Sequence, residues 1–304
     1  MKACILLSTY NGEKFLAQQL DSILAQRDVE ILLLVRDDGS TDGTRVILRD
    51  YASHHPNIRL RLEDNLGFAG SFDALLRWGH AECANQVEYF AFADQDDYWM
   101  PEKVSVAVEA IQGKGGVWLY MSNATIADSK LTPVCPLFDK PIEKMTFAQA
   151  LIDAYTYGCT MCMNRALLDA YVRMTQRVPV VHDRWCYLLS MLLGHVVYDP
   201  MSHLLYRQHG NNAGGVKCKT TDIIGRIRLM RKVGRLISDT DLQLYESIVR
   251  AGSVPPQSLE MVVAYRRSFW GRIRLLLKWN ELGFNRRCFG DDFKKRIKIL
   301  MGVV

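Results

Sequence analysis

Several sequence signatures are missing from this chain of 304 residues, and each absence argues against a class of protein. Neither GxGxxG after the first predicted strand nor GxxxxGK followed by Ser or Thr occurs, which argues against dinucleotide-binding and P-loop chemistry. No repeat of about 20–50 residues is present, which argues against a solenoid or a propeller. The best candidate for a membrane span, residues 185–198, is shorter than the roughly 20 residues that a spanning helix needs.

The cysteines form no pattern that is typical of a disulfide framework. The apolar run after Met1 is too short for a secretory signal, so we expect the cytosol, where thiols stay reduced. Cys159 and Cys162 have the spacing of a redox or zinc half-site, but no second CxxC and no nearby histidine pair accompany them. We therefore expect these two cysteines to be structural. The eight cysteines are Cys4, Cys83, Cys135, Cys159, Cys162, Cys186, Cys218 and Cys288.

Charge is unevenly distributed along the chain. Residues 1–216 hold 19 Lys and Arg against 25 Asp and Glu, a net charge of −6, whereas residues 217–304 hold 19 against 8, a net charge of +11. Such a basic segment indicates an anionic partner, either a membrane surface or nucleic acid. Its helical apolar stripe predicts membrane contact, and packing on the rest of the protein is the alternative. The stripe comprises Ile223, Ile227, Met230, Val233 and Ile237.

Apolar runs and helical periodicities alternate through the first 112 residues. They predict strands over residues 3–8, 31–35, 58–62 and 88–93, and helices over residues 13–26, 45–53, 72–84 and 103–112. This alternation predicts an α/β fold with a mostly parallel sheet and helices on both faces. Further on, the pattern predicts strands over 117–122 and 195–198, a loop over 129–147, helices over 147–155, 165–174 and 183–193, and a glycine-rich loop ending the segment 203–215.

Polar residues follow three of the predicted strands. The segment Ser8 to Asn11 follows the first strand, Asp37 and Asp38 follow the second, and the block Asp94 to Asp97 follows the fourth. In an open α/β sheet, ligands bind at the carboxyl ends of the strands. Three carboxylates within four residues repel one another unless a cation neutralises them, and oxygen ligands suit Mg²⁺ or Mn²⁺. We therefore predict a divalent metal site, and such ions also bridge diphosphate oxygens; a solvated turn with an Asp helix cap is the alternative.

Seven blocks of the sequence together resemble one enzyme family. They are Ser8–Gly12, Gln19–Gln26, Arg36–Thr44, Asn65–Gly67, Asp94–Lys103, His182–Trp185 and Tyr206–Asn212. On these blocks, across about residues 3–215, the chain resembles a family 2 glycosyltransferase with a GT-A fold, and within it the bacterial rhamnosyltransferases of surface polysaccharide synthesis. The resemblance implies a catalytic domain over residues 1–216, with a nucleotide-binding half at about 1–100 and an acceptor half at about 101–216. Residues 217–304 would form a basic amphipathic helical tail that contacts a membrane or another copy of the chain.

The resemblance implies roles for individual positions. Asp183 matches the catalytic base, although His182 stands where the family usually has Glu, and on spacing alone Asp183 would be an N-cap. Asp96 and His209 match metal ligands. The nucleotide-binding positions are Thr9, Tyr10, Asn11, Asp37, Asp38, Asn65, Asp94 and Gln95. Further candidates for contact with the donor diphosphate or substrate are Asp97, Arg207, Trp99, His182 and Gly158, with core packing as the alternative for Trp99.

The activity that the resemblance implies is an inverting, Mn²⁺- or Mg²⁺-dependent glycosyl transfer at the inner face of the cell membrane. The expected donor is dTDP-rhamnose, with a UDP-hexose or UDP-N-acetylhexosamine as the alternative, and the expected acceptor is a lipid-linked glycan. One carboxylate suffices as base, and no covalent nucleophile is needed. Two alternatives come from other classes: a catalytically silent nucleotide- or glycan-binding module, and a nucleic-acid-binding protein built around the basic tail. The acidic body argues against a nucleic-acid partner.

Overall fold

The computed structural model describes residues 1–83, 86–138, 145–152, 156–174, 181–209, 241–250, 255–267 and 269–278. The chain divides into two compact units. The first comprises Met1–Ile142, Tyr157–Arg173 and Leu193–Lys217, and the second comprises Glu143–Thr156, Met174–Leu192 and Cys218–Val304. The apolar stripe predicted within residues 223–237, the glycine-rich residues 210–215, and Cys218 and Cys288 lie outside the described residues.

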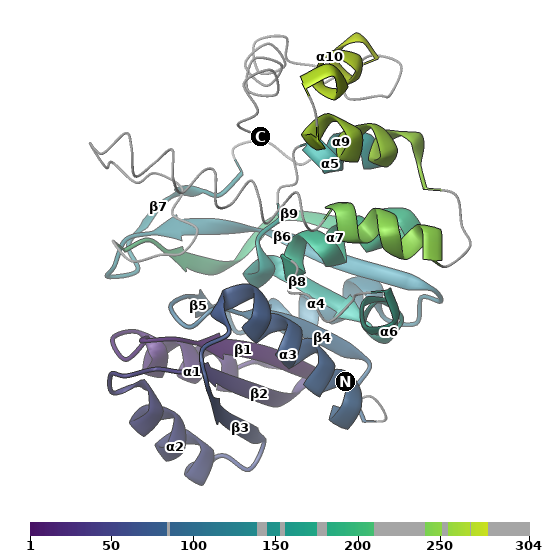
Figure 1. The fold of residues 1–304 in the computed structure, drawn as a ribbon. Helices are drawn as coiled ribbons and strands as arrows, with labels where there is room; N and C mark the ends of the chain where they lie inside the picture. The colour runs from purple at the N-terminus through teal and green to yellow at the C-terminus, as the bar shows by residue number, and fades with distance from the viewer. Residues whose placement is uncertain are drawn as a thin grey trace. The chain divides into compact units, whose positions relative to one another are not determined.

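A mixed β-sheet forms the centre of the first unit (Figure 1). Strand β1 (Lys2–Thr9) pairs in parallel with β2 (Glu30–Asp38) and β4 (Tyr89–Ala93), and β2 pairs in parallel with β3 (Ile58–Glu63). The carboxyl ends of these four strands therefore lie at one edge of the sheet, where ligands bind in open α/β folds.

The other half of this sheet is mostly antiparallel. Strand β8 (Met161–Asn164) pairs antiparallel with β4 and with β6 (Val117–Ala127), and β7 (Pro133–Pro136) also pairs antiparallel with β6. Strand β9 (Gly194–Arg207) runs parallel to β6 and antiparallel to β5 (Tyr98–Trp99). Over the described residues the order is β3-β2-β1-β4-β8-β6-β9-β5.

Helices cover both faces of the parallel strands. Apolar residues of α1 (Leu16–Leu24), α2 (Thr44–His54) and α4 (Lys103–Ile111) share one core with alternate residues of β1 and β2. On the other face, α3 (Gly67–Cys83) packs against β1, where a Cβ added to Gly79 would lie 3.4 Å from Leu6. Because successive side chains of a strand point to opposite faces, a continuous apolar run such as β1 can serve both cores.

The strand and helix alternation expected for residues 1–112 is present, and three expectations further along are wrong. Strand β7 lies inside the predicted loop 129–147, and β8 lies where no strand was expected. Strand β9 continues to Arg207, nine residues beyond the end of the predicted strand 195–198. Strand β8 has only four residues, all buried, and such a short run has no periodicity that separates strand from helix. Helix α6 (Arg165–Met174) follows it directly, as expected.

The second unit is helical over its described residues. It contains α5 (Phe147–Ile152), most of α7 (His182–Leu193), a helix over residues 241–250, α9 (Gln257–Arg267) and α10 (Phe269–Leu277). A buried ion pair joins α7 to the 241–250 helix, because Arg184 Nη2 lies 2.9 Å from Asp241 Oδ1. Helix α9 packs against α5 and α10. Among the helices described, none has the length and apolar character needed to cross a bilayer.

Candidate active site

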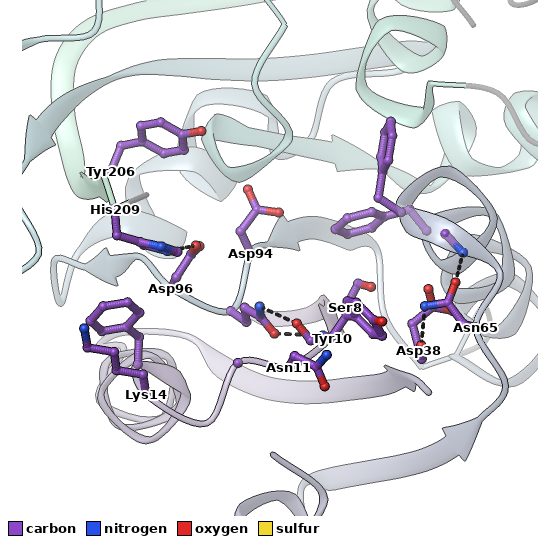
Figure 2. Close-up of a pocket in the computed structure, with 16 residues that line it drawn as sticks. Ser8, Tyr10, Asn11, Lys14, Asp38, Asn65, Asp94, Asp96, Tyr206 and His209 are labelled. Carbon is purple, nitrogen blue, oxygen red and sulfur yellow. Dashed lines mark hydrogen bonds and ion pairs between the residues drawn. The ribbon is translucent and has the colours of Figure 1, made fainter. Parts of the chain in front are cut away.

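A cavity of about 770 Å³ lies at the carboxyl ends of β1, β2 and β4 in the first unit (Figure 2). This volume is in the range of small-molecule binding sites. The cavity is lined by Ser8, Tyr10, Asn11, Gly12, Lys14, Phe15, Asp38, Asn65, Gly67, Phe68, Phe72, Asp94, Gln95, Asp96, Tyr206 and His209.

Eight residues that the sequence assigned to nucleotide or metal binding line this cavity. In Figure 2, Asp96 and His209 lie at one end of the cavity, and Asp38 and Asn65 lie at the other. We call the end with Asp96 and His209 the acidic end. We call the other end, where Asp38 lies beside the side-chain amide of Asn65, the amide-bearing end. The eight residues are Tyr10, Asn11, Asp38, Asn65, Asp94, Gln95, Asp96 and His209.

The side chain of Gln95 fixes the loop that follows β1. Its Oε1 accepts a hydrogen bond from the Tyr10 N–H at 2.8 Å, and its Nε2 donates to the Tyr10 carbonyl at 3.0 Å. Gly12 lies against the same side chain, and a Cβ on it would lie 2.2 Å from Gln95 Oε1. The absence of a side chain at Gly12 therefore allows Gln95 to hold Tyr10, whose half-exposed ring lines the cavity.

Asn11 ties the loop after β1 to the loop after β2. Its N–H donates to Ser40 Oγ at 2.9 Å, and its Oδ1 accepts from the Thr41 N–H at 2.8 Å. The backbone of Asn11 is left-handed, with φ of 48°, a conformation that Asn adopts more readily than most residues. Asn11 thus has a structural task as well as a place in the cavity wall.

Asp37 and Thr9, both predicted to bind nucleotide, are buried and do not line the cavity. Thr9 Oγ1 donates to Asp37 Oδ2 at 3.1 Å, and Arg45 Nε donates to Asp37 Oδ1 at 2.6 Å. The Ser40 N–H also donates to Asp37, at 3.0 Å. These contacts make Asp37 the acceptor that organises the turn after β2.

Asp38 borders the amide-bearing end of the cavity. Its Oδ1 accepts from the Leu66 N–H at 2.7 Å and from the buried Arg36 guanidinium. Asn65 Nδ2 donates to the Asp38 carbonyl at 2.8 Å. The turn after Asp38 requires Gly39, whose φ is +83° and on which a Cβ would lie 2.9 Å from the Asn65 nitrogen.

The acidic end combines Asp94 and Asp96, from the end of β4, with His209, which follows β9. His209 Nε2 lies 2.7 Å from Asp96 Oδ2, and both side chains are largely buried. The Phe15 ring lies 4.8 Å from the His209 ring. Two segments more than a hundred residues apart in the sequence thus meet at one point of the cavity.

These residues fit a divalent cation. Asp94 and Asp96 offer carboxylate oxygens, which suit Mg²⁺ and Mn²⁺, and His209 adds an imidazole nitrogen. The ring nitrogen of His209 and the carboxylate of Asp96 already face each other, so one ion can contact both.

Asp97 differs from its acidic neighbours because it is fully buried and does not line the cavity. Burial, together with the carboxylates of Asp94 and Asp96, raises the pKa of Asp97 well above its usual value. Single ligand atoms of Asp94, Asp97 and Cys159 lie within 4.8 Å of one another. Burial also raises the pKa of the Cys159 thiol, which keeps it protonated. Asp97 accepts the Arg207 N–H at 3.3 Å, a structural contact.

Three other predicted contacts in this unit are not part of the cavity wall. Trp99 is 1% exposed and belongs to the core, with the Lys103 ammonium 3.9 Å from its ring centroid. Gly158 lies in a short 3₁₀ helix, Gly158–Thr160, just before β8. Arg207 is 2% exposed and its guanidinium bonds to protein atoms.

Asp183 and His182 begin α7 in the second unit. Asp183 is partly exposed, and its Oδ1 accepts the Arg184 N–H at 2.6 Å. His182 is buried, and burial lowers its pKa to about 3, so its imidazole is neutral near pH 7. A neutral imidazole places no charge beside Asp183.

Several cavity residues were absent from the sequence prediction, among them Ser8, Lys14, Phe15 and Tyr206. Ser8 lies near the end of β1 and was among the polar residues noted at that strand end, but no binding role was assigned to it. Lys14 and Phe15 begin the helical segment after β1, and their periodicity indicated only a helix. No sequence signal distinguishes Phe15 from the core residues Leu16 and Leu20.

Known proteins resemble this chain in both sequence and fold. The chain is 27% identical over 237 residues to the dTDP-rhamnosyl transferase RfbG of Shigella flexneri, across 74% of this chain and 79% of that protein. The structure of S. aureus TarS 1–349 with UDP-GlcNAc has a TM-score of 0.57 at 17% identity, covering 99% of this chain and 91% of that one. The mannosyltransferase PcManGT of Pyrobaculum calidifontis, in complex with GDP-Man and Mn²⁺, has a TM-score of 0.55 at 17% identity, covering 99% and 85%.

Residues 4–171, more than half of the chain, match the family described as glycosyl transferase family 2. The parallel β1–β4 sheet, the acidic residues after β4 and the fold shared with glycosyltransferase structures agree with that match. The chain therefore belongs to glycosyl transferase family 2, and it is a glycosyltransferase with the GT-A fold.

Proposed function

We propose that the enzyme transfers rhamnose from dTDP-rhamnose to a lipid-linked glycan, with a divalent metal and with inversion at the anomeric carbon. The observation that carries this proposal is the cavity at the ends of β1, β2 and β4, which has Asp96 and His209 at one end, Asp38 and Asn65 at the other, and Asp94 between them on the side of Asp96. The similarity to a protein named as a dTDP-rhamnosyl transferase, across 74% of the chain, supports the choice of donor.

The polarity of the cavity orients the donor. A diphosphate would bind at the end where Asp94, Asp96 and His209 would hold a cation, because a bound cation would offset the negative charge of the phosphates. The nucleoside then extends toward Asp38 and Asn65. Along this path the half-exposed ring of Tyr10 offers an aromatic surface for a base, held by its two hydrogen bonds to Gln95.

The chemistry separates into leaving-group stabilisation and proton removal. A bound Mn²⁺ or Mg²⁺ supplies Lewis-acid stabilisation of the charge that develops on the diphosphate. Lys14 lines the same cavity and adds a positive charge to it. Asp183 accepts the proton of the attacking hydroxyl, and its bond from the Arg184 N–H orients the carboxylate. A single displacement by that hydroxyl inverts the anomeric centre.

The donor proposal has one alternative within the family, a UDP-hexose or a UDP-N-acetylhexosamine. TarS, which shares the fold, is described in complex with UDP-GlcNAc. Thymine and uracil differ by one methyl group, and a single methylene in an apolar pocket is worth only about 1–3 kcal/mol. The relative thermal shifts with dTDP and UDP therefore distinguish these donors.

The acceptor proposal is supported by the second unit. The last described helix, α10, exposes Trp270 and Leu277, which are 77% and 79% exposed, and Arg274 lies on the same face. Residues 217–304 carry a net charge of +11. Exposed aromatic and apolar side chains on a helix of a strongly basic segment are typical of binding at an anionic membrane surface. We propose peripheral contact with the inner face of the cell membrane, where a lipid-linked acceptor would be presented.

A thermal-shift panel tests the donor site. The panel uses dTDP, UDP, GDP and CDP, each with and without Mn²⁺, on the wild-type protein and on Asp96→Ala. A ligand at about 100 times its Kd stabilises the folded state by about 2.7 kcal/mol, so the shift is measurable. We expect a Mn²⁺-dependent shift with dTDP that Asp96→Ala abolishes. A larger shift with UDP would select the alternative donor, and folded protein without any nucleotide shift would contradict the proposal.

A further inference from the structure

We propose that Arg207 and Phe15 are positioning residues that hold Asp96 and His209 in the geometry needed to bind the metal. The inference rests on the metal site of the proposed function and assigns it two supporting residues. It also gives Arg207 a different task from the diphosphate contact expected from the sequence. A closed series of contacts runs from Asp96 through Arg207 and Phe15 to His209 and back to Asp96.

Arg207 joins the acidic turn to two other segments. Its Nε donates to the Asp96 carbonyl at 2.7 Å, Nη1 donates to the Ser129 carbonyl at 2.7 Å, and Nη2 donates to Gln18 Oε1 at 2.6 Å. Its backbone N–H also donates to Asp97 Oδ1 at 3.3 Å. All three guanidinium nitrogens thus have a protein acceptor, and the side chain is buried at 2% exposure. A group so placed supports the turn and does not reach a diphosphate in the cavity.

Phe15 completes the series from the other side. The guanidinium carbon of Arg207 lies 4.4 Å from the centroid of the Phe15 ring, a cation–π contact. The same ring lies 4.8 Å from the His209 ring, inclined at 40°. His209 Nε2 in turn lies 2.7 Å from Asp96 Oδ2. Phe15 therefore limits the rotation of the His209 ring, while Arg207 fixes the backbone that carries Asp96.

Support of this kind has a measurable effect on metal affinity. Groups that orient metal ligands typically contribute 10–100-fold to metal affinity. Lysine cannot replace arginine here, because an ammonium does not reproduce the planar fork that meets the Asp96, Ser129 and Gln18 acceptors. Leucine at position 15 keeps apolar bulk but removes the ring that contacts both Arg207 and His209.

The test measures Mn²⁺ binding directly, by the loss of the free Mn²⁺ signal in electron paramagnetic resonance, with dTDP or UDP present. The variants are Arg207→Lys and Phe15→Leu. Arg61→Lys is the matched control, because Arg61 also lies over an aromatic ring, 4.1 Å from Trp78, and also makes a hydrogen bond, to Glu82 at 2.7 Å. Arg61 does not line the cavity.

We expect the Mn²⁺ Kd to rise about tenfold or more in Arg207→Lys and severalfold in Phe15→Leu, with Arg61→Lys unchanged. The Mn²⁺ concentration for half-maximal turnover should rise in parallel. Unchanged Mn²⁺ affinity in both folded variants would overturn the proposal. So would a raised donor KM that saturating Mn²⁺ does not lower, because that is the signature of a diphosphate contact.

Failure of the proposed function gives a different result. If the wild-type protein binds no Mn²⁺ with either nucleotide, the metal site itself is wrong. If the wild type binds Mn²⁺ and both variants bind it equally well, only the positioning roles are wrong. Phe15→Leu changes no charge, so it tests the series of contacts even if Arg207→Lys does not fold.

Discussion

Asp37 and Asp38 are adjacent in the sequence, but their carboxylates have different surroundings. Both are almost fully buried, yet only Asp38 borders the cavity, and Asp37 is enclosed by Thr9, Ser40 and Arg45. Successive side chains of a strand point to opposite faces, which separates the two carboxylates. The sequence predicted an acidic pair at a strand end. It did not predict which of the two carboxylates borders the cavity, because that depends on how β2 lies in the sheet, and no sequence motif encodes this.

Because His182 is buried, the free energy of unfolding should depend on pH in the acidic range. Burial lowers its pKa to about 3, against 6.5 for an ordinary histidine, so between these values the unfolded chain binds a proton that the folded chain does not. The free energy of unfolding should therefore fall as pH falls below about 6.5, by up to about 1.4 kcal/mol per pH unit from this residue. His182→Gln should show a shallower fall in denaturant titrations at pH 7, 6 and 5. Parallel pH profiles for the two proteins would contradict this.

Asp183→Asn tests the proposed general base. Asparagine is nearly the same shape but cannot take up the proton, so turnover should fall about 10²–10⁴-fold. Nucleotide affinity, measured by calorimetry with Mn²⁺, should stay within about twofold. Asp169→Asn on α6 is a suitable control, because that partly exposed carboxylate lies 3.2 Å from His80 and does not line the cavity. Turnover that persists in Asp183→Asn would exclude Asp183 as the base.

At the scale of elements, the sequence predicted the βα alternation of residues 1–112 because buried parallel strands and amphipathic helices have distinct patterns. Strand β9 was predicted as residues 195–198 but continues to Arg207. Its later residues alternate partly exposed and buried side chains, and its register against β6 shifts at Ser122 and Asn123. Strand β7 is exposed and begins and ends with proline. These features are compatible with an edge strand, but in the sequence alone they indicate a loop.

Helix α10 provides a test of the proposed membrane contact. Trp270, Arg274 and Leu277 are four and three residues apart, so they lie on one exposed face of the helix. The double variant Trp270→Ala, Leu277→Ser should reduce co-flotation with vesicles that contain anionic lipid, and high salt should reduce the binding of the wild type. Val46→Ser removes a comparably exposed apolar side chain, 68% exposed, from α2 in the first unit and should have no effect. Equal flotation of all three proteins would exclude α10 as the membrane contact.

For the whole molecule, six of the eight predicted residues that line the cavity were accessible to sequence reasoning because strand ends converge in a parallel sheet, whereas Asn65 and His209 came from the family resemblance. The proposed positioning role of Arg207 could not be predicted from the sequence. It depends on contacts with the Asp96 and Ser129 carbonyls and with the Phe15 ring, which are all distant from Arg207 in the chain. The position of Asp183 relative to the cavity involves two separate units of the chain. The proposed base therefore rests on the family resemblance, and the Asp183→Asn variant tests it.

The bond between Arg207 and Gln18 spans 189 positions of the sequence. Contacts between distant positions form late in folding, because the chain must close a long loop before it gains them. Strands β1 to β4 can pair once the first 93 residues are available, but the acidic end of the cavity is complete only after residues 207 and 209 arrive. During synthesis, at about 5–20 residues per second, this is a delay of several seconds or more. The nascent chain can therefore pair its four parallel strands well before the proposed metal site is assembled.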